Sequence, residues 1–178
     1  MIKKADINDV EKLAGLGVMM WKNHTVQELA DEFSEIINQG NAQFFLKYDK
    51  DMSIGFAQCQ LRYDYVEGTH NSPVGYLEGI FVKEEYRHKG YAKELLSECE
   101  KWAKEKGCTE FASDCELENV NSLQFHMAMG FHEANRIICF TKKLAIKKRR
   151  TEQNCTSFYL HLTRKKVHPV DFFLRKHP

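Results

Sequence analysis

The sequence predicts an α/β or α+β fold in which one mixed sheet is flanked by helices. Segments with strand-like alternation and segments with helical spacing follow one another as strand, two helices, hairpin, strand, helix, strand, helix, strand. The chain has 178 residues, of which 43% are hydrophobic, and this is enough for one domain with a buried core. A strand that leads through a glycine turn into a long helix lies at the centre of the chain.

Local signals mark most of these elements. Thr25 with Glu28 three residues later forms a capping-box pattern, and Gly40 is placed to stop the helix that follows. Asp6 or Asn8 can cap the helix before it. In chain order we expect an edge strand over 2–5, a helix over 10–20, a helix from Thr25 to Gly40, a hairpin of strands over 44–48 and 54–65, a strand over 75–82, a helix from Gly90 to Gly107, a strand over 108–115, a helix from Asn119 to Gly130, and strand material over 131–144.

Two strands carry acidic residues. Regular alternation over 75–82 places Tyr76, Glu78, Ile80 and Val82 on one face, so that Glu78 is a charge inside an apolar strand. In the same way, a strand over 108–115 that runs on would project Asp114, Glu116 and Glu118 toward one face, where together they would attract a polycation. Solvation at a strand edge is the rival interpretation for Asp114, and the favoured one for Glu116 and Glu118.

The most informative segment is the turn from Arg87 to Ala92, which has the form R-x-x-G-x-A and contains Arg87, His88, Lys89, Gly90, Tyr91 and Ala92. A turn between a strand and a helix exposes backbone N–H groups at the helix N-terminus, and Gly90 and Ala92 would let a phosphate approach the main chain. Arg87 and Lys89 add positive charge. A polar turn that merely starts a helix is the alternative.

These residues resemble the GCN5-related N-acetyltransferase superfamily, whose pyrophosphate loop has the pattern (Arg/Gln)-x-x-Gly-x-(Gly/Ala). A second element of that superfamily, an asparagine before a short helix that ends in Gly-Phe, is matched by Asn119, Asn121, Ser122 and 129–131. The resemblance implies a mixed, mainly antiparallel sheet and acetyl-CoA as cosubstrate. It further implies that Arg87 to Ala92 hold the pyrophosphate, that acetyl-CoA contacts Ile80, Phe81, Val82 and Asn119, and that His126 lies near the cofactor.

Residues 75–82, Ser113-Asp114 and Gly130-Phe131 are similar to those of aminoglycoside 6'-N-acetyltransferases. This similarity covers residues 1 to about 144 and implies that the acceptor contacts Trp21, Tyr65, Glu78 and Asp114. Asn135 stands where such members often have an acidic residue, which removes one charge partner for a substrate amine. His126 occupies the place of a tyrosine that many members use as general acid.

Acetyl transfer to an amine needs a base and a donor for the developing oxyanion. Glu78 is the candidate base, and an N–H of Ile80 to Val82 is the candidate donor, particularly if a β-bulge frees it from the sheet. The alternative for Glu78 is an ion pair at a strand end. For Trp21 and Tyr65 the alternative to stacking on a sugar ring is ordinary core packing. A direct attack in a ternary complex is favoured over an acetyl-cysteine intermediate, and a core role is expected for Cys115.

Composition limits the partners. The chain has a formal net charge of +1, which divides into −6 for residues 1–144 and +7 for residues 145–178. The first part is predicted to be the acetyltransferase domain and the second a basic extension of unknown role, which could pack in a homodimer or bind nucleic acid. Six cysteines without a C-x-x-C pair predict reduced thiols and no metal site, and the N-terminus lacks a signal peptide, so a cytoplasmic protein is expected.

The predicted function is therefore acetyl-CoA-dependent acetylation of the 6'-amino group of aminoglycosides, which gives antibiotic resistance. A protein N-terminal or polyamine acetyltransferase is the alternative within the class. A non-catalytic acyl-CoA-binding module, whose basic tail recruits nucleic acid, is the alternative from another class.

Overall fold

The computed structural model describes residues 1–144, of which 1–135 form one compact unit and 136–144 belong to a second. A five-stranded sheet in the order β1-β2-β3-β4-β5 is the centre of the first unit. Its strands β1 to β4 are antiparallel neighbours, and β4 and β5 are parallel, which confirms the predicted mixed and mainly antiparallel sheet. The strands are β1 (Ile2–Lys4), β2 (Ala42–Asp49), β3 (Met52–Arg62), β4 (Val74–Val82) and β5 (Phe111–Ser113).

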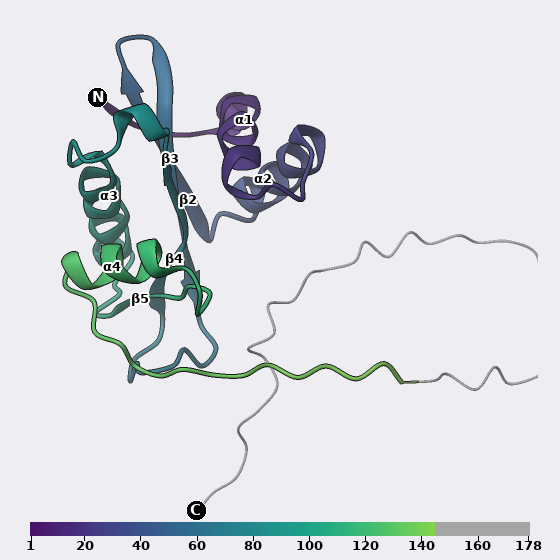
Figure 1. The fold of residues 1–178 in the computed structure, drawn as a ribbon, viewed down its shortest axis with the longest axis vertical. Coiled ribbons are helices and arrows are strands. Elements are labelled where there is room, and N and C mark those ends of the chain that lie inside the picture. The colour runs from purple at the N-terminus through teal and green to yellow at the C-terminus, as the bar shows by residue number, and fades with distance from the viewer. Residues whose placement is uncertain (145–178) are drawn as a thin grey trace, which may run out of the picture. The chain divides into compact units, whose positions relative to one another are not determined.

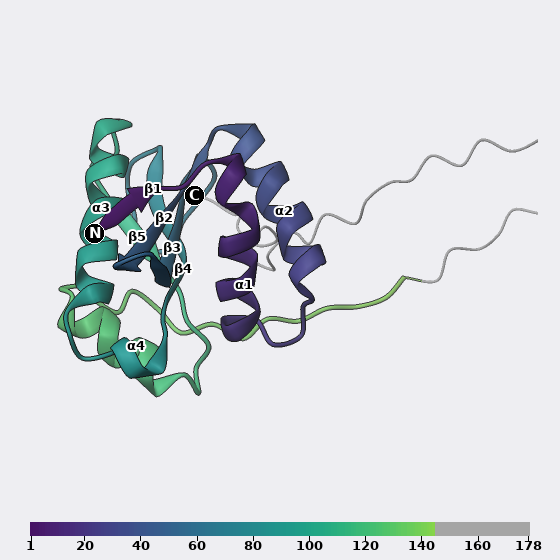
Figure 2. The same ribbon diagram turned by 90° about the horizontal axis from the view of Figure 1, so that it is seen from above.

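Helices cover both faces of the sheet, so the unit has three layers (Figures 1 and 2). On one face lie α1 (Val10–Met20) and α2 (Val26–Gln39), and on the other lies α3 (Tyr91–Glu105). A shorter helix, α4 (Val120–Ala128), follows β5. Two 3-10 turns, Ile7–Asp9 and Glu84–Tyr86, precede α1 and α3.

The predicted helix boundaries are confirmed by their caps. Thr25 and Glu28 form the reciprocal capping box of α2, and Gly40 ends that helix at φ 73°. Asp6 caps the 3-10 turn before α1. Asn119 caps α4 by accepting a hydrogen bond from the backbone N–H of Ser122.

Two hydrophobic clusters lie on opposite faces of the sheet. The cluster under α3 contains the apolar stripe that helical spacing predicts. That stripe, fully buried, consists of Leu95, Leu96, Cys99, Trp102 and Ala103. The other cluster joins α1 and α2 to the sheet through aromatic residues, among them Phe33, Phe44 and Phe56.

Three strand predictions are wrong. The third strand ends at Arg62 rather than at residue 65, and β5 ends at Ser113, so Asp114, Glu116 and Glu118 follow the strand instead of lying along it. Residues 131–144 contain no strand in the part of the chain that the structure describes. A strand is stable only where its backbone groups pair with a neighbour, and a favourable residue pattern does not supply that neighbour.

A β-bulge at Glu78 corrects a fourth expectation. In the β3–β4 ladder Gln58 lies opposite Gly79 and Cys59 opposite Leu77, so that Glu78 is the extra residue. The insertion reverses the alternation beyond it. Ile80 and Val82 therefore pack in the cluster under α3, whereas Tyr76 packs in a separate small cluster with Val66 and Val74. The four predicted residues do not share one face.

Candidate active site

The two strands β4 and β5 separate shortly after they meet, and this separation creates the candidate site. They pair only over Gly75–Leu77 and Phe111–Ser113. Glu78 is the first residue of β4 beyond the paired stretch, and Asp114 is the first residue after β5. The edge of β4 from residue 78 to Val82 thus has no strand beside it among the described residues.

Arg62 binds Glu78 at this point. Its Nη2 donates to Glu78 Oε1 at 2.8 Å and to Oε2 at 3.0 Å, and its Nε donates to Oε1 at 3.0 Å. The side chains of Arg62 and Glu78 are only 19% and 11% exposed. The ion pair that the sequence left open for Glu78 is therefore present, and the guanidinium favours the ionised form of the carboxyl group.

Tyr76 links this pair to Asp114. The guanidinium carbon of Arg62 lies 3.4 Å from the centroid of the Tyr76 ring, and the Tyr76 hydroxyl donates to Asp114 Oδ1 at 2.6 Å. Burial of the ring, followed by the hydrogen bond to Asp114, raises the pKa of Tyr76 well above its usual range. Tyr76 therefore stays a donor at all physiological pH values.

The aromatic candidates have different surroundings. Trp21 is partly buried and packs against Phe33 and Phe56, with ring centroids 6.0 and 5.7 Å away. A Cβ on Gly79 would lie 2.9 Å from Trp21 Cζ2, so the ring lies directly on the backbone of the bulge. Tyr65 is instead 60% exposed, and its hydroxyl donates to Glu67. Core packing is therefore the main environment of the Trp21 side chain but not of the Tyr65 side chain. Asn135, the last residue of the unit, is exposed.

The glycine turn has the geometry that its sequence predicts. Gly90 has φ 81° and is the N-cap of α3, and no atom lies within 4 Å of a Cβ built on it. The first backbone N–H groups of α3 have no partner inside the helix and point out of its N-terminus. His88 also has positive φ, at 60°. Arg87 Nε donates to the carbonyl of Val82 at 3.0 Å, which ties the turn to the end of β4, and Lys89 lies over the ring of Tyr86.

The segment of β4 that is predicted to contact the cofactor remains in the ladder. Ile80, Phe81 and Val82 lie opposite Ala57, Phe56 and Gly55, and the bulge is at Glu78 rather than within the segment. Because hydrogen bonds alternate sides along an antiparallel strand, the segment still directs some of its backbone groups to the edge that has no strand. These groups are the ones available to a thioester carbonyl.

His126 of α4 joins the site to β5. Its Nδ1 lies 2.7 Å from the carbonyl oxygen of Ser122, which can only accept, so Nδ1 carries the proton. Its Nε2 lies 3.0 Å from Ser113 Oγ, and the Ser113 hydroxyl donates its hydrogen to the carbonyl of Leu77. The contact places His126 beside the last paired residues of β4 and β5.

The cysteines lie partly in the core and partly on the surface. Cys115 is exposed, so the core role expected for it is wrong, whereas Cys59, Cys99 and Cys108 are buried free thiols. No group of three or more potential metal ligands occurs within residues 1–144. No helix in that range is both long and apolar enough to cross a membrane.

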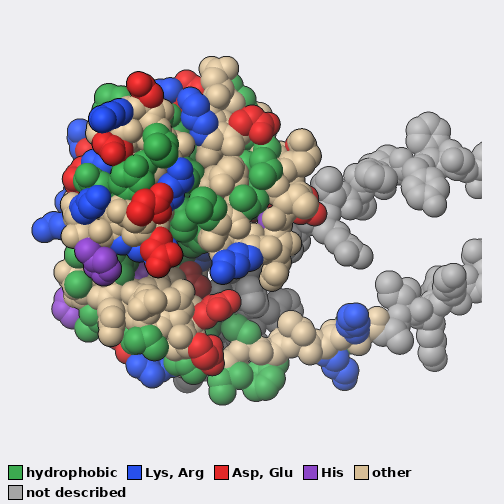
Figure 3. Space-filling view, turned by 45° about the horizontal axis from the view of Figure 1, so that its top comes forward, with side chains coloured by type: hydrophobic (Ala, Val, Ile, Leu, Met, Phe, Trp, Pro, Cys, Tyr) green, Lys and Arg blue, Asp and Glu red, His purple; other side chains and the backbone are tan. Residues whose placement is uncertain are grey.

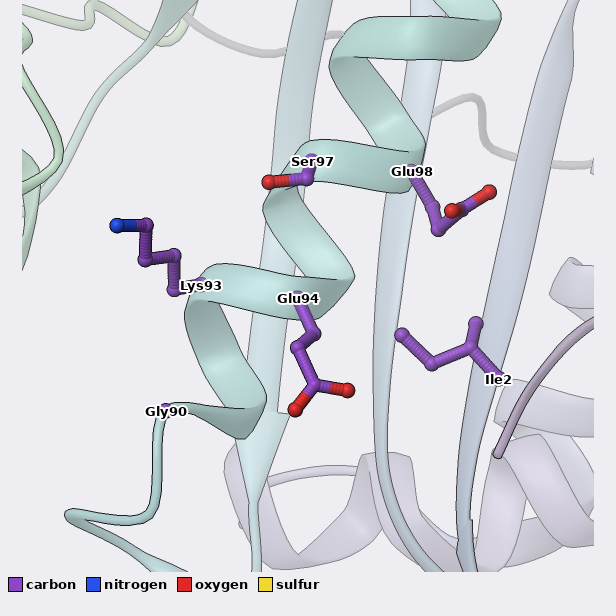
Figure 4. Close-up of a pocket in the computed structure, with 6 residues that line it drawn as sticks. All are labelled: Ile2, Gly90, Lys93, Glu94, Ser97 and Glu98. Carbon is purple, nitrogen blue, oxygen red and sulfur yellow. The ribbon is translucent and has the colours of Figure 1, made fainter.

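A shallow depression beside the turn lies between α3 and β1. It is lined by Gly90, Ile2 and four residues of α3, and Glu94 and Glu98 point toward β1 whereas Lys93 points away (Figure 4). Beneath it, the buried Lys47 pairs with Glu94 and lies 4.4 Å from the centroid of the Tyr91 ring. Lys47 thereby ties the first turn of α3 to the sheet.

The separated strands β4 and β5 and the glycine turn at the N-terminus of α3 are the main features of the candidate site. The model of the acetyltransferase (GNAT) family matches residues 13–131, and the chain belongs to this family. It is 42% identical over 130 residues to an aminoglycoside N(6')-acetyltransferase type 1 of Acinetobacter baumannii, covering 72% of this chain and 88% of the relative. It is 36% identical over 142 residues to the protein of the same name from Salmonella enteritidis, covering 80% and 98%.

Solved structures agree with this assignment. The aminoglycoside N-acetyltransferase AAC(6')-Iy in complex with CoA superposes with a TM-score of 0.78 at 35% identity and covers 81% of this chain and 95% of that one. A structure of AAC(6')-Iy with the bisubstrate analogue CoA-S-monomethyl-acetylneamine gives 0.77 at 35% identity and covers 81% and 98%. The predicted family and fold are therefore confirmed.

Three participants in the site were not predicted from the sequence: Arg62, Tyr76 as a donor, and Ser113. Arg62 is a charged residue at the end of an apolar strand, just as Glu78 is a charged residue inside one, so the same signal could have identified it. Eleven residues connect β3 to β4, and their sequence does not reveal the strand register that brings Arg62 to Glu78. Ser113 belongs to the Ser113-Asp114 pair that carries part of the resemblance, but no role was predicted for it.

Proposed function

We propose that the protein transfers the acetyl group of acetyl-CoA to the 6'-amino group of aminoglycosides, and thereby confers resistance to these antibiotics. The observation that carries the proposal is the placement of two carboxylates, Glu78 and Asp114, where β4 and β5 separate, with the glycine turn at the other end of the free β4 edge. The similarity to enzymes named for this activity, at up to 42% identity, supports it.

The geometry suits a polycationic acceptor. Asp114 and Glu78 can accept hydrogen bonds from ammonium groups, and the exposed ring of Tyr65 can stack on a sugar. Residues 1–144 have a net charge of −6, and acidic and basic side chains are interspersed over the face that Figure 3 shows. Such a surface favours the approach of a cation without excluding the CoA phosphates from the basic turn.

The reaction requires one proton to leave the amine and one tetrahedral oxyanion to be stabilised. The amine nitrogen attacks the thioester carbon, its proton passes to Glu78 directly or through a water, and the C–S bond breaks. A backbone N–H of Ile80, Phe81 or Val82 donates to the carbonyl oxygen as its charge grows. His126, whose Nε2 contacts Ser113, is the group proposed to return a proton to the departing thiolate.

The cosubstrate is proposed to lie along the free edge of β4. From Glu78 to Val82 the strand spans about 13 Å. A cosubstrate that lies extended along this stretch would reach from the acceptor site toward the turn. Its pyrophosphate would bind the N–H groups of Gly90, Tyr91 and Ala92, with Arg87, His88 and Lys89 around it, and Asn119 would contact its other side.

A thiol-release assay tests the proposal. Purified protein with acetyl-CoA should release CoA on addition of neomycin but not of paromomycin, which has a hydroxyl at the 6' position and is otherwise matched. Mass spectrometry should find one added acetyl group, and NMR should assign it to the 6' nitrogen. Release with a polyamine or a peptide N-terminus, and with no aminoglycoside, would overturn the proposed acceptor.

We place the protein in the cytoplasm, where acetyl-CoA is supplied, and cell fractionation tests this. We also propose a homodimer, because Ile137, Ile138 and Phe140 are a run of apolar side chains, and such a run favours burial against a second copy. Light scattering of wild type and of Ile138→Lys/Phe140→Lys should give a dimer and a monomer. The predicted role of the basic extension at residues 145–178 lies outside the described residues.

A further inference from the structure

Arg62 is a cation that the structure places in direct contact with a proposed active-site carboxylate, Glu78. It is the last residue of β3, and its register partner on β4 is Val74. To reach Glu78, its side chain runs along β4 across the ring of Tyr76. Its 19% exposure shows that most of the side chain is removed from water.

This path makes Arg62 and Tyr76 a stacked pair between two carboxylates. Arg62 holds Glu78 by three short contacts, and Tyr76 holds Asp114 by its hydroxyl. One acidic group lies in β4 and the other directly follows β5, and a shift of the stacked pair would move both. A planar guanidinium fits this place better than an ammonium group, since it can stack on a ring and bind a carboxylate in its plane.

We infer that Arg62 is a positioning residue for acetyl transfer: it acts through Glu78, fixing the carboxylate at the bulge so that it meets the attacking amine. This inference rests on the proposed function and extends it to a residue that makes no contact of its own with the acceptor. A bulged residue lacks the ladder partner that fixes its neighbours, so the aim of Glu78 depends on its side-chain contacts.

The role has a distinctive kinetic signature. Arg62 puts a positive charge into a site that must attract a polycation, so its presence opposes binding while it supports the chemical step. Its removal should therefore lower kcat and leave the KM of the amine unchanged or reduced. A residue that only stabilises the fold would lower the melting temperature and loosen the whole site, so that the KM of the amine would rise while kcat falls.

Arg62→Met and Arg62→Lys test the inference. Lys4→Met is the control, because Lys4 lies on the outer strand β1 and forms an exposed ion pair with Glu105 of α3. Both Arg62 variants should lose about 10- to 100-fold in kcat, since a misplaced catalytic group costs about that much, with no rise in amine KM. Lys keeps the charge but not the planar contact, so it should not restore the rate. Lys4→Met should retain wild-type kinetics.

A double variant separates positioning from stability. If Arg62 acts through Glu78, Arg62→Met/Glu78→Gln should have a kcat no lower than that of Glu78→Gln alone. Tyr76→Phe keeps the stacked ring and removes the donor to Asp114, so it should raise the amine KM more than it lowers kcat, and it remains informative if Arg62→Met fails to fold. A near-normal kcat in Arg62→Met, or losses that multiply in the double variant, would overturn the inference.

The outcomes for Arg62 and for the aminoglycoside proposal are distinguishable. All ratios are measured with whichever amine the wild-type protein acetylates, so a preference for polyamines would overturn the acceptor and still test Arg62. A wild-type protein that acetylates no amine would overturn both.

Discussion

Replacement of Glu78 by Gln tests the proposed base most directly, because Gln has nearly the same shape and no charge. Loss of a general base lowers kcat by about 10²- to 10⁴-fold. Acetyl-CoA affinity should be unchanged, since the turn that would bind it is at the other end of β4. Steady-state thiol release and calorimetric titration with CoA measure the two quantities.

The same variant should also lose stability by an amount that follows from its contacts. Arg62 and Glu78 are 19% and 11% exposed and share three hydrogen bonds. Weakening hydrogen bonds to a charged group costs about 1.5–3 kcal/mol. For a chain of this size that corresponds to a fall in Tm of roughly 3–12 °C.

Glu116→Gln is the matched control for both effects. Glu116 is an exposed acid two residues beyond Asp114, and its neutralisation should change neither kcat nor Tm. A kcat for Glu78→Gln within about threefold of wild type would refute the assignment of Glu78 as base, since no transition-state interaction would have been lost. In that case Glu78 would serve only to bind the acceptor.

Three further predictions concern the surroundings of the site and the fold. Gly90→Ala should cost about 1–2 kcal/mol for positive φ alone and, in addition, raise the KM of acetyl-CoA, measured by thiol release. Gly79→Ala should displace the Trp21 ring, which a Cβ would approach to 2.9 Å, and raise the acceptor KM while that of acetyl-CoA stays unchanged. Burial opposes ionisation of Asp9, but hydrogen bonds led by that of Lys3 lower its pKa below 3.8, so its stabilisation is present above pH 3.8 and lost as the pH falls further. Asp9→Asn should therefore cost about 1.5–3 kcal/mol in urea unfolding at neutral pH, and the difference from wild type should shrink in acid.

The helices could be predicted from the sequence because their signals are local. The capping box at Thr25, the stop at Gly40 and the apolar stripe of α3 each depend on residues a few positions apart. The glycine turn is local too, and its positive φ at Gly90 follows from the residue type. These parts of the fold and of the proposed cofactor site could therefore be predicted from the sequence.

The strands and the acceptor side of the site depend on partners far along the chain. Arg62 meets Glu78 only because the register of β3 and β4 brings them together across a connection that no local rule specifies. The bulge at Glu78 has no sequence signature either, and it is the reason that Ile80 and Val82 face α3 while Tyr76 does not. The pairing of β3 with β4, and not the alternation of residue types alone, determines on which face of the sheet these side chains lie.

The shortness of β5 connects the largest error to the proposed function. Asp114, Glu116 and Glu118 alternate as in a strand, yet the strand ends at Ser113 after only three paired residues. Had β5 continued beside β4, its backbone would have occupied the edge from residue 78 to Val82, and no backbone group there could reach a thioester. The early end of β5 leaves that edge available and sets Asp114 at its beginning, hydrogen-bonded to Tyr76. The early end of β5, which made the strand prediction wrong, thus leaves the edge of β4 at which the acceptor and the cosubstrate are proposed to react.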